Sequence, residues 1–153
     1  MTTTALPTTS SAPSASSVAS PVAGKLPAAA LGVTRVVVSF LFICHGMVGL
    51  FGAFGGVDGR GGTIDPLSWP GGWASLIHLV AGALVLVGLW TRPAALLSSG
   101  AMAYAYFTVH QPIALFPIPN GGEPAALYSW ILLLIGILGP GAFALDTLRK
   151  RRR

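Results

Sequence analysis

The sequence predicts an all-α integral membrane protein, a four-helix bundle with its N-terminus and C-terminus both cytoplasmic. Hydrophobic residues make up 53% of the 153 residues and charged residues only 8%. A soluble domain carries roughly 25% charged residues, which it needs to cover its surface. The few charges also leave four long uncharged stretches. Five of the nine basic residues follow the last of these stretches, at the C-terminus.

The uncharged stretches are 36–57, 66–91, 93–122 and 124–145, which are 22, 26, 30 and 22 residues long. Each can supply the roughly 20 apolar residues that a helix needs to cross about 30 Å of hydrocarbon. With their flanking turn signals they predict spans at about 33–55, 73–90, 93–111 and 122–140. Pro93 opens the third span, since proline is favoured in the first helical turn, and Gly-Pro-Gly at 139–141 ends or kinks the fourth. These spans make up a membrane domain over residues 31–146.

The two ends of the chain differ in composition from this domain. Residues 1–30 are rich in Ser, Thr, Ala and Pro, which predicts a disordered tail because such a segment buries little apolar surface. A chloroplast-type transit peptide is the alternative, but those segments tend to be rich in arginine. Residues 147–153 form a basic tail, which fits anionic lipid headgroups rather than nucleic acid because it directly follows a span.

The basic residues also predict the orientation. Lys25 and Arg35 precede the first span, Arg92 lies between the second and third, and the basic tail follows the fourth. The other two connections are mostly acidic and contain Asp58, Arg60, Asp65 and Glu123. The positive-inside rule therefore places both termini in the cytoplasm of a multi-pass protein of the cell membrane.

Four ionisable residues within or at the edge of the spans are the candidates for a functional site, because such residues are costly in a membrane. At about 1.5 Å per residue, His45 lies about 15 Å beyond Arg35, and His78 lies about 8 Å below Trp73. All of them fall in the outer half of the membrane, which predicts a polar pocket open to the outside. Simple solvation at the boundary, or a satisfied core histidine, is the alternative for each member. The four residues are His45, His78, His110 and Glu123.

The spacing of these four residues bears on whether the pocket could bind a metal ion or haem. No two of them share ligand spacing on one helix, so the sequence carries no metal or haem signature. The single cysteine, Cys44, lies in an apolar run and is interpreted as a packing residue.

Glycines and one loop complete the candidate positions. Gly46, Gly52 and Gly56 lie in the first span, and the last two have the GxxxG spacing that lets helices approach closely, within one chain or in a homo-oligomer. The 111–122 connection is apolar and contains three prolines, so we expect it to lie as a lid between His110 and Glu123. Within it, Gly121 and Gly122 supply the turn into the fourth span and Asn120 caps it.

Four segments resemble the DoxX family, in order and with matching spacing over residues 32–146. They are HGMVGLFGAFGG (45–56), GLWTRPAALL (88–97), AYAYFTVHQPIALFPIPNGGEPAALY (103–128) and GPGAFALD (139–146). The family consists of four-helix bacterial membrane proteins related to a subunit of terminal quinol oxidase or of thiosulfate:quinone oxidoreductase. The matching positions are His45, Gly46, Arg92, His110, Asn120, Gly121, Gly122 and Glu123. This chain departs from the family where a charged residue is common, at Gly49, His78 and Ala101.

The resemblance implies a role beside respiratory or redox assemblies, without assigning a reaction or deciding whether the chain is an enzyme. Three functions follow as hypotheses: a quinone-associated accessory subunit, a membrane scaffold subunit without chemistry, and a small-molecule transporter. For the first, quinone is the possible cofactor, because apolar walls with a few imidazole and carboxylate groups suit a quinone headgroup. Transport comes third, since four helices leave little room for a pathway without oligomerisation. The expected partners are the lipid bilayer, redox membrane proteins and further copies of this chain, but not nucleic acid.

Overall fold

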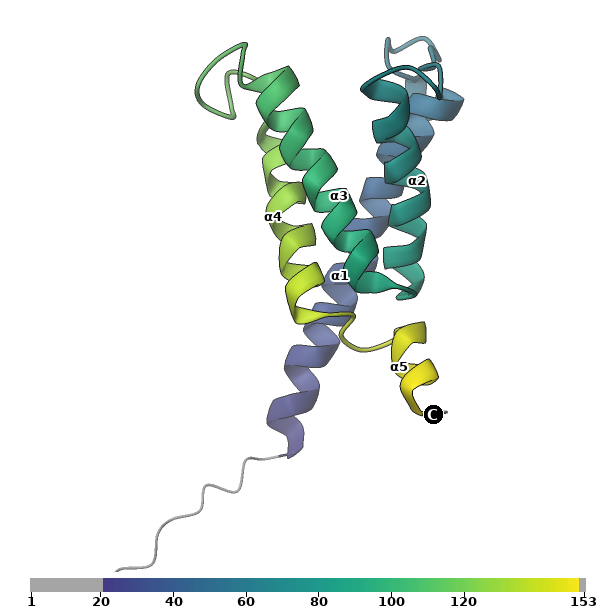
Figure 1. The fold of residues 1–153 in the computed structure, drawn as a ribbon, viewed down its shortest axis with the longest axis vertical. Coiled ribbons are helices and arrows are strands. Elements are labelled where there is room, and N and C mark those ends of the chain that lie inside the picture. The colour runs from purple at the N-terminus through teal and green to yellow at the C-terminus, as the bar shows by residue number, and fades with distance from the viewer. Residues whose placement is uncertain (1–20, 152–153) are drawn as a thin grey trace, which may run out of the picture.

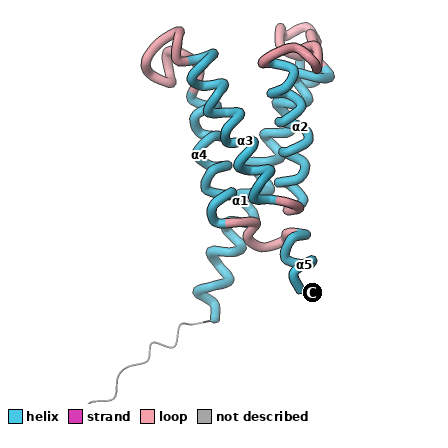
Figure 2. The backbone as a smooth tube through the Cα atoms, viewed as in Figure 1, coloured by secondary structure: helices cyan, strands magenta, loops and turns pink. Residues whose placement is uncertain are grey.

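The computed structural model describes residues 21–151, which are mostly helical (Figure 1, Figure 2). The order is α1 (Pro21–Phe51), a short 3-10 turn η1 (Ala53–Gly55), α2 (Gly71–Val87), α3 (Thr91–Ala105), a π-helical segment η2 (Tyr106–His110), α4 (Glu123–Leu138) and α5 (Leu145–Arg151). The described residues contain no β-strand, only one isolated bridge between Gly56 and Gly62. The predicted all-helical class is confirmed.

The four long helices are arranged as two pairs. α1 packs mainly on α2 and α3 mainly on α4, while α2 and α3 join the pairs and α1 barely contacts α4. Figure 1 shows the pairs meeting near the tight turn between α2 and α3 and separating toward the opposite side. We call the side with this turn and α5 the turn end, and the side with the 52–70 and 111–122 connections the loop end. The buried core includes Phe42, Val85, Ala95, Leu132 and Ile135.

The outer surfaces of the helices are apolar. Side chains such as Phe40, Val80 and Trp130, from three different helices, are 57–72% exposed. α1 is long and apolar enough to cross a membrane over Gly24–Phe51, while α2 and α4 are apolar but only 17 and 16 residues long. α3 has 15 residues and runs directly into the five residues of η2. Helices that are apolar on all sides are typical of proteins in lipid.

Both ends of the helical region differ from the sequence-based boundaries. α1 begins at Pro21, so residues 21–30 are helical rather than part of a disordered tail; residues 1–20 lie outside the described part. The extra turns pack at the turn end, where the Ala142 amide donates to the Ala28 carbonyl over 2.8 Å. At the other end, α5 begins at Leu145 and extends into the predicted basic tail, of which Arg152 and Arg153 lie outside the described residues.

The glycines of the first span have two different roles. A Cβ at Gly46 would lie 2.9 Å from the Ser75 carbonyl oxygen, so this glycine allows α1 and α2 to pack closely within the chain. Gly52 and Gly56 do not lie on a helix face, because α1 already ends at Phe51 and both have φ near +65°. They turn the chain against the loop at Gly61 and Gly62. The predicted helical GxxxG interface at these two positions is therefore wrong.

Arg35 lies inside the bundle rather than before the first span, which corrects its predicted position. Its side chain is fully buried in α1, and every donor nitrogen of its guanidinium donates to backbone carbonyls. Nη1 donates to two carbonyls of the last turn of α2, over 2.6 Å each. Nε and Nη2 donate to the segment after α4, at Pro140, Ala142 and Phe143, over 2.9–3.3 Å. One side chain thus ties α1, α2 and the chain after α4 together at the turn end.

Asp146 makes the second tie at this end. Its carboxylate accepts hydrogen bonds from the Trp90 amide (3.0 Å), the Thr91 amide (3.0 Å) and the Thr91 hydroxyl (2.9 Å), at the start of α3. Its own amide donates to the Gly88 carbonyl over 2.8 Å. A carboxylate at a helix N-terminus satisfies free amides and matches the helix dipole. The turn between α2 and α3 is therefore locked to the start of α5.

Candidate functional site

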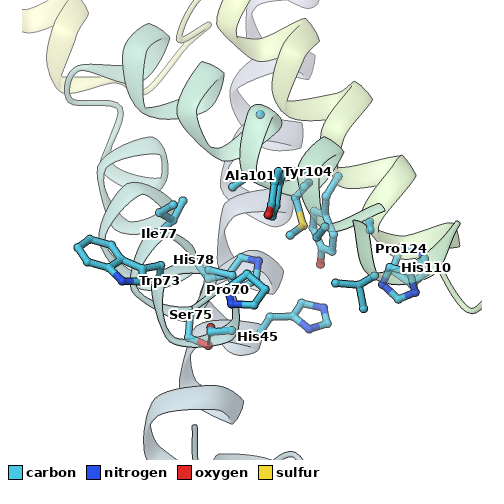
Figure 3. A pocket seen from close by; sticks show the side chains of 18 of the residues that line it. His45, Pro70, Trp73, Ser75, Ile77, His78, Ala101, Tyr104, His110 and Pro124 are labelled. Atoms are coloured by element: carbon cyan, nitrogen blue, oxygen red, sulfur yellow. Dashed lines mark hydrogen bonds between the residues drawn. The ribbon is translucent and has the colours of Figure 1, made fainter. Parts of the chain in front are cut away.

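A cavity of about 710 Å³ lies between the two helix pairs toward the loop end (Figure 3). All four long helices contribute to its walls, together with the segment that leads into α2. Most lining side chains are apolar or aromatic, among them Trp69, Trp73, Ile77, Leu97 and Met102. Within the described chain, the lining contains no Asp, Glu, Lys or Arg. The cavity is thus an apolar space whose polar groups are few.

Three of the four residues predicted to form the site line this cavity. His45 comes from α1, His78 from α2 and His110 from the end of η2. The ring centroids of His45 and His78 are 6.1 Å apart. Figure 3 shows His110 on the other side of the opening, near Pro124 at the start of α4. The fold therefore collects imidazoles from three separate elements at one cavity.

Aromatic contacts hold His45 and His78 in place. The His78 ring meets Phe42 edge-on, with ring centroids 4.3 Å apart, and the His45 ring meets Tyr128 edge-on at 5.5 Å. Phe42 and Tyr128 contact each other at 5.4 Å. Because residues three apart share a helix face, Phe42 and His45 both point from α1 toward α2 and α4. Offset and edge-on aromatic pairs of this kind are favourable and directional, so they orient the imidazoles.

The turn into α4 holds His110. Nδ1 of His110 lies 3.1 Å from the Asn120 carbonyl oxygen. The Asn120 side chain is buried, donates to the Ala114 carbonyl over 2.9 Å, and accepts from the Gly122 amide over 2.7 Å. Gly121 has φ +68°, and a Cβ at Gly122 would lie 2.7 Å from the His110 Cβ. Asn120, Gly121 and Gly122 thus build this turn, although Asn120 bonds the residue before α4 and not a helical amide.

Glu123 and the 111–122 connection lie elsewhere than predicted. Glu123 is exposed at the first position of α4 and does not line the cavity, whereas Pro124, Ala125 and Tyr128 do. Helical rotation of about 100° per residue turns Glu123 away from the face that these neighbours share. Of the 111–122 connection only Gly121 lines the cavity, and Figure 1 shows the connection extending away from α2. It is therefore not a lid over the cavity.

Sequence reasoning missed the tyrosines of the site. Tyr104 and Tyr128 line the cavity and carry hydroxyl groups, and the Tyr104 ring lies 5.5 Å from the Trp69 ring across its mouth. The signal in the sequence was a tyrosine within an apolar run, where its hydroxyl needs a polar partner, but such a run does not show which side faces the cavity. Arg92, by contrast, is exposed at the turn end and lines a different cavity. Among the described residues, no group of three His, Cys, Asp or Glu side chains could hold a metal ion.

Apolar helices that diverge around an aromatic and imidazole-lined cavity define a helical membrane protein with a small-molecule-sized site. The DoxX family model matches residues 30–111, more than half of the chain, and the chain therefore belongs to the DoxX family of membrane proteins. A protein of Haemophilus influenzae, described as an uncharacterized protein, is 40% identical over 120 residues, which cover 76% of this chain and 87% of that protein. No solved structure matches the chain. The resemblance noted from the sequence is confirmed.

Proposed function

We propose that the four long helices cross the cell membrane of a bacterium, with the loop end outside and the turn end in the cytoplasm. The charge distribution supports this orientation. Arg92 and Arg149 lie at the turn end, whereas Asp58 and Asp65 lie in the connection at the loop end. An excess of basic residues marks the cytoplasmic side of membrane proteins. In this orientation the cavity opens in the outer half of the bilayer.

The cavity accommodates a quinone headgroup, and the chain acts as an accessory subunit of an oxidoreductase assembly. The observation that carries this proposal is the apolar, aromatic cavity of about 710 Å³ with three imidazoles. Small-molecule sites commonly measure roughly 300–1,000 Å³ and combine apolar walls with a few polar groups. A bound quinone would supply exchange of two electrons and two protons with a partner subunit.

The residues of the cavity fit such a ligand. Imidazole can donate or accept a hydrogen bond, and a tyrosine hydroxyl can do both, so either suits the carbonyl and hydroxyl oxygens of a quinone and its reduced form. His45, His78 and His110 supply the imidazoles, and Tyr104 and Tyr128 supply the hydroxyls. The aromatic walls suit a flat ring, and their low polarity excludes water from it.

Tryptophan fluorescence tests this proposal, because Trp69 and Trp73 line the cavity. A short-chain ubiquinone added to the purified protein in detergent should quench this fluorescence in a saturable manner. The double variant His45→Ala/His78→Ala should bind about tenfold more weakly, which corresponds to about 1.4 kcal/mol. The control Leu134→Ala, which changes a lipid-facing side chain of α4, should bind normally. Equal affinity in both variants, or quenching that never saturates, would reject the cavity as a quinone site.

A scaffold role is the second candidate, favoured by the connections at the loop end. Phe54, Leu67, Phe116 and Ile118 are 68–79% exposed on these connections. The scaffold would use these side chains rather than the glycine-rich face of α1, because Gly46 and Gly49 already pack against α2. Loss of co-purifying proteins from a Phe116→Ser/Ile118→Ser variant, together with unchanged quinone binding, would favour the scaffold.

A further inference from the structure

A second cavity at the turn end contains two arginines. It measures about 550 Å³ and lies between the start of α3, the end of α4 and α5. Arg92 reaches it from the first turn of α3, and Arg149 from α5. Both are exposed, and within residues 24–149 neither side chain donates a hydrogen bond. Two guanidinium groups from separate elements thus face one space with their donors free for a ligand.

The single carboxylate in this cavity offsets only part of the positive charge of the two arginines. Asp146 also lines the space, but its two oxygens already accept from the Trp90 amide and from the amide and hydroxyl of Thr91. The carboxylate is therefore engaged in holding the start of α3. Two positive charges against one engaged carboxylate leave a net positive cavity, which suits an anion. Arginine in particular matches the geometry of a phosphate group through paired N–H donors.

A third cavity adjoins this one and is apolar. It measures about 430 Å³ and lies along the outer surface between α2 and α3. Its walls include Val80, Leu84 and Leu97, and it extends toward Trp73 near the loop end. Trp90 and Pro93 line both cavities, so the arginine cavity and the apolar groove meet at these two residues. A basic pocket beside a lipid-facing groove matches the two parts of a phospholipid. The pocket suits the charged headgroup, and the groove suits an acyl chain.

We propose that the turn end binds one anionic phospholipid. Arg92 and Arg149 hold its phosphate, and one acyl chain passes over Trp90 and Pro93 into the groove between α2 and α3. Basic pockets between transmembrane helices on the cytoplasmic side are suited to anionic headgroups. The adjoining groove favours a lipid over a free phosphate ion, which has no chain to fill it. The site is separate from the histidine-lined cavity and does not depend on quinone binding.

Thermal unfolding of the full-length protein in detergent tests the site. Mixed micelles with phosphatidylglycerol should raise the unfolding temperature by about 3–6 °C above micelles with phosphatidylcholine, because a ligand of the folded state stabilises it. Arg92→Gln and Arg149→Gln should each remove most of this difference. The matched control Arg60→Gln changes an exposed arginine at the loop end and should keep it.

A second measurement covers the case in which an arginine variant folds poorly. Native mass spectrometry of the wild-type protein should show one retained phosphatidylglycerol molecule, with about tenfold less retained by Arg92→Gln and by Arg149→Gln than by Arg60→Gln. Equal retention of phosphatidylglycerol and phosphatidylcholine, or unchanged retention in both arginine variants, would overturn the proposal. If millimolar inorganic phosphate in phosphatidylcholine micelles gave the same stabilisation, the site would bind soluble phosphate and the lipid assignment would be wrong.

Discussion

Arg35 shows how a permanently charged side chain is accommodated inside an apolar helix bundle. Its guanidinium bonds backbone carbonyls rather than a carboxylate, and two of these carbonyls belong to the last turn of α2. The last carbonyls of a helix lack helical partners and carry the negative end of the helix dipole, so a cation is favourable there. The remaining bonds reach the irregular segment after α4. One residue thereby gives hydrogen bonds to polar groups from two places, and it shares the Val85 carbonyl with the Gly88 amide.

Arg35→Lys should therefore be strongly destabilising although it keeps the charge. An ammonium has three donors where the guanidinium has five, so at least two of the five carbonyls lose their bond. Each buried polar group left unsatisfied costs about 1–3 kcal/mol. We expect a clearly lower unfolding temperature in detergent, measured by circular dichroism. Arg60→Lys, at an exposed position, is the control and should unfold at the wild-type temperature. Equal stability of the two variants would show that the carbonyl bonds of Arg35 contribute little.

The residues of the candidate site could be predicted only in part, because the sequence indicates depth better than direction. Counting along the helices placed His45, His78 and His110 at one level, and the structure brings these three to one cavity. Glu123 has a suitable depth but lies on the wrong side of α4. Tyr128 was missed for the converse reason, since nothing in an apolar run marks which side faces the cavity. The directions depend on how the two helix pairs diverge, which is a long-range property.

At the scale of elements, turn signals predicted helix ends well where they act locally. α4 ends at Leu138, directly before Gly139-Pro140, and α3 begins two residues before Pro93. Hydropathy failed where tertiary contacts extend or shorten a helix. α1 starts early because its first turns pack on the segment around Ala142, and it stops at Phe51 because Gly52 turns the chain back onto the loop. α5 was missed because its basic composition concealed the contact of Asp146 with α3.

The contact between α5 and the start of α3 leads to a test at this scale. Asp146→Ala should lower the free energy of unfolding by about 1–2 kcal/mol at pH 7, because the Trp90 and Thr91 donors lose their acceptor. Chemical unfolding in mixed micelles would measure this change. Glu123→Ala is the control, since Glu123 is an exposed carboxylate at the start of α4 whose side chain accepts no bond from the described residues.

The same contact predicts a pH dependence. Partial burial raises the pKa of Asp146, but hydrogen bonds from Thr91 and Trp90 and the charge of Arg149 outweigh it and lower the pKa below its ordinary value. A carboxyl group with a lowered pKa stabilises the fold fully above its unfolded pKa of about 3.9, and this contribution is lost as the pH falls through the folded value. The difference between wild type and Asp146→Ala should therefore be constant from pH 5 to 8 and shrink below about pH 4. A difference that persists unchanged at lower pH would assign the effect to packing instead.

For the whole molecule, the two ends have opposite characters. The turn end is held by the bonds of Arg35 and Asp146, which connect α1, α2, α3 and α5. The loop end has separated helix pairs and carries the cavity between them. A molecule fixed at one end and open at the other can admit a ligand by small movements of the pairs without losing its fold. The topology proposed above places both connections at the loop end on the same side of the membrane.

Cysteine labelling can test that arrangement, because the chain has a single cysteine, Cys44. In a Cys44→Ser background, Thr63→Cys and Gln111→Cys place an exposed thiol in each connection of the loop end, and Leu148→Cys places one on α5. A membrane-impermeant maleimide should label the first two in intact cells, and the third only after the membrane is permeabilised. This result is expected from the proposed topology, in which the basic turn end lies in the cytoplasm and four crossings return the chain to its starting side. Labelling of Leu148→Cys in intact cells would invert the topology. Protection of only one of the two connections at the loop end would mean that a helix pair does not cross the membrane.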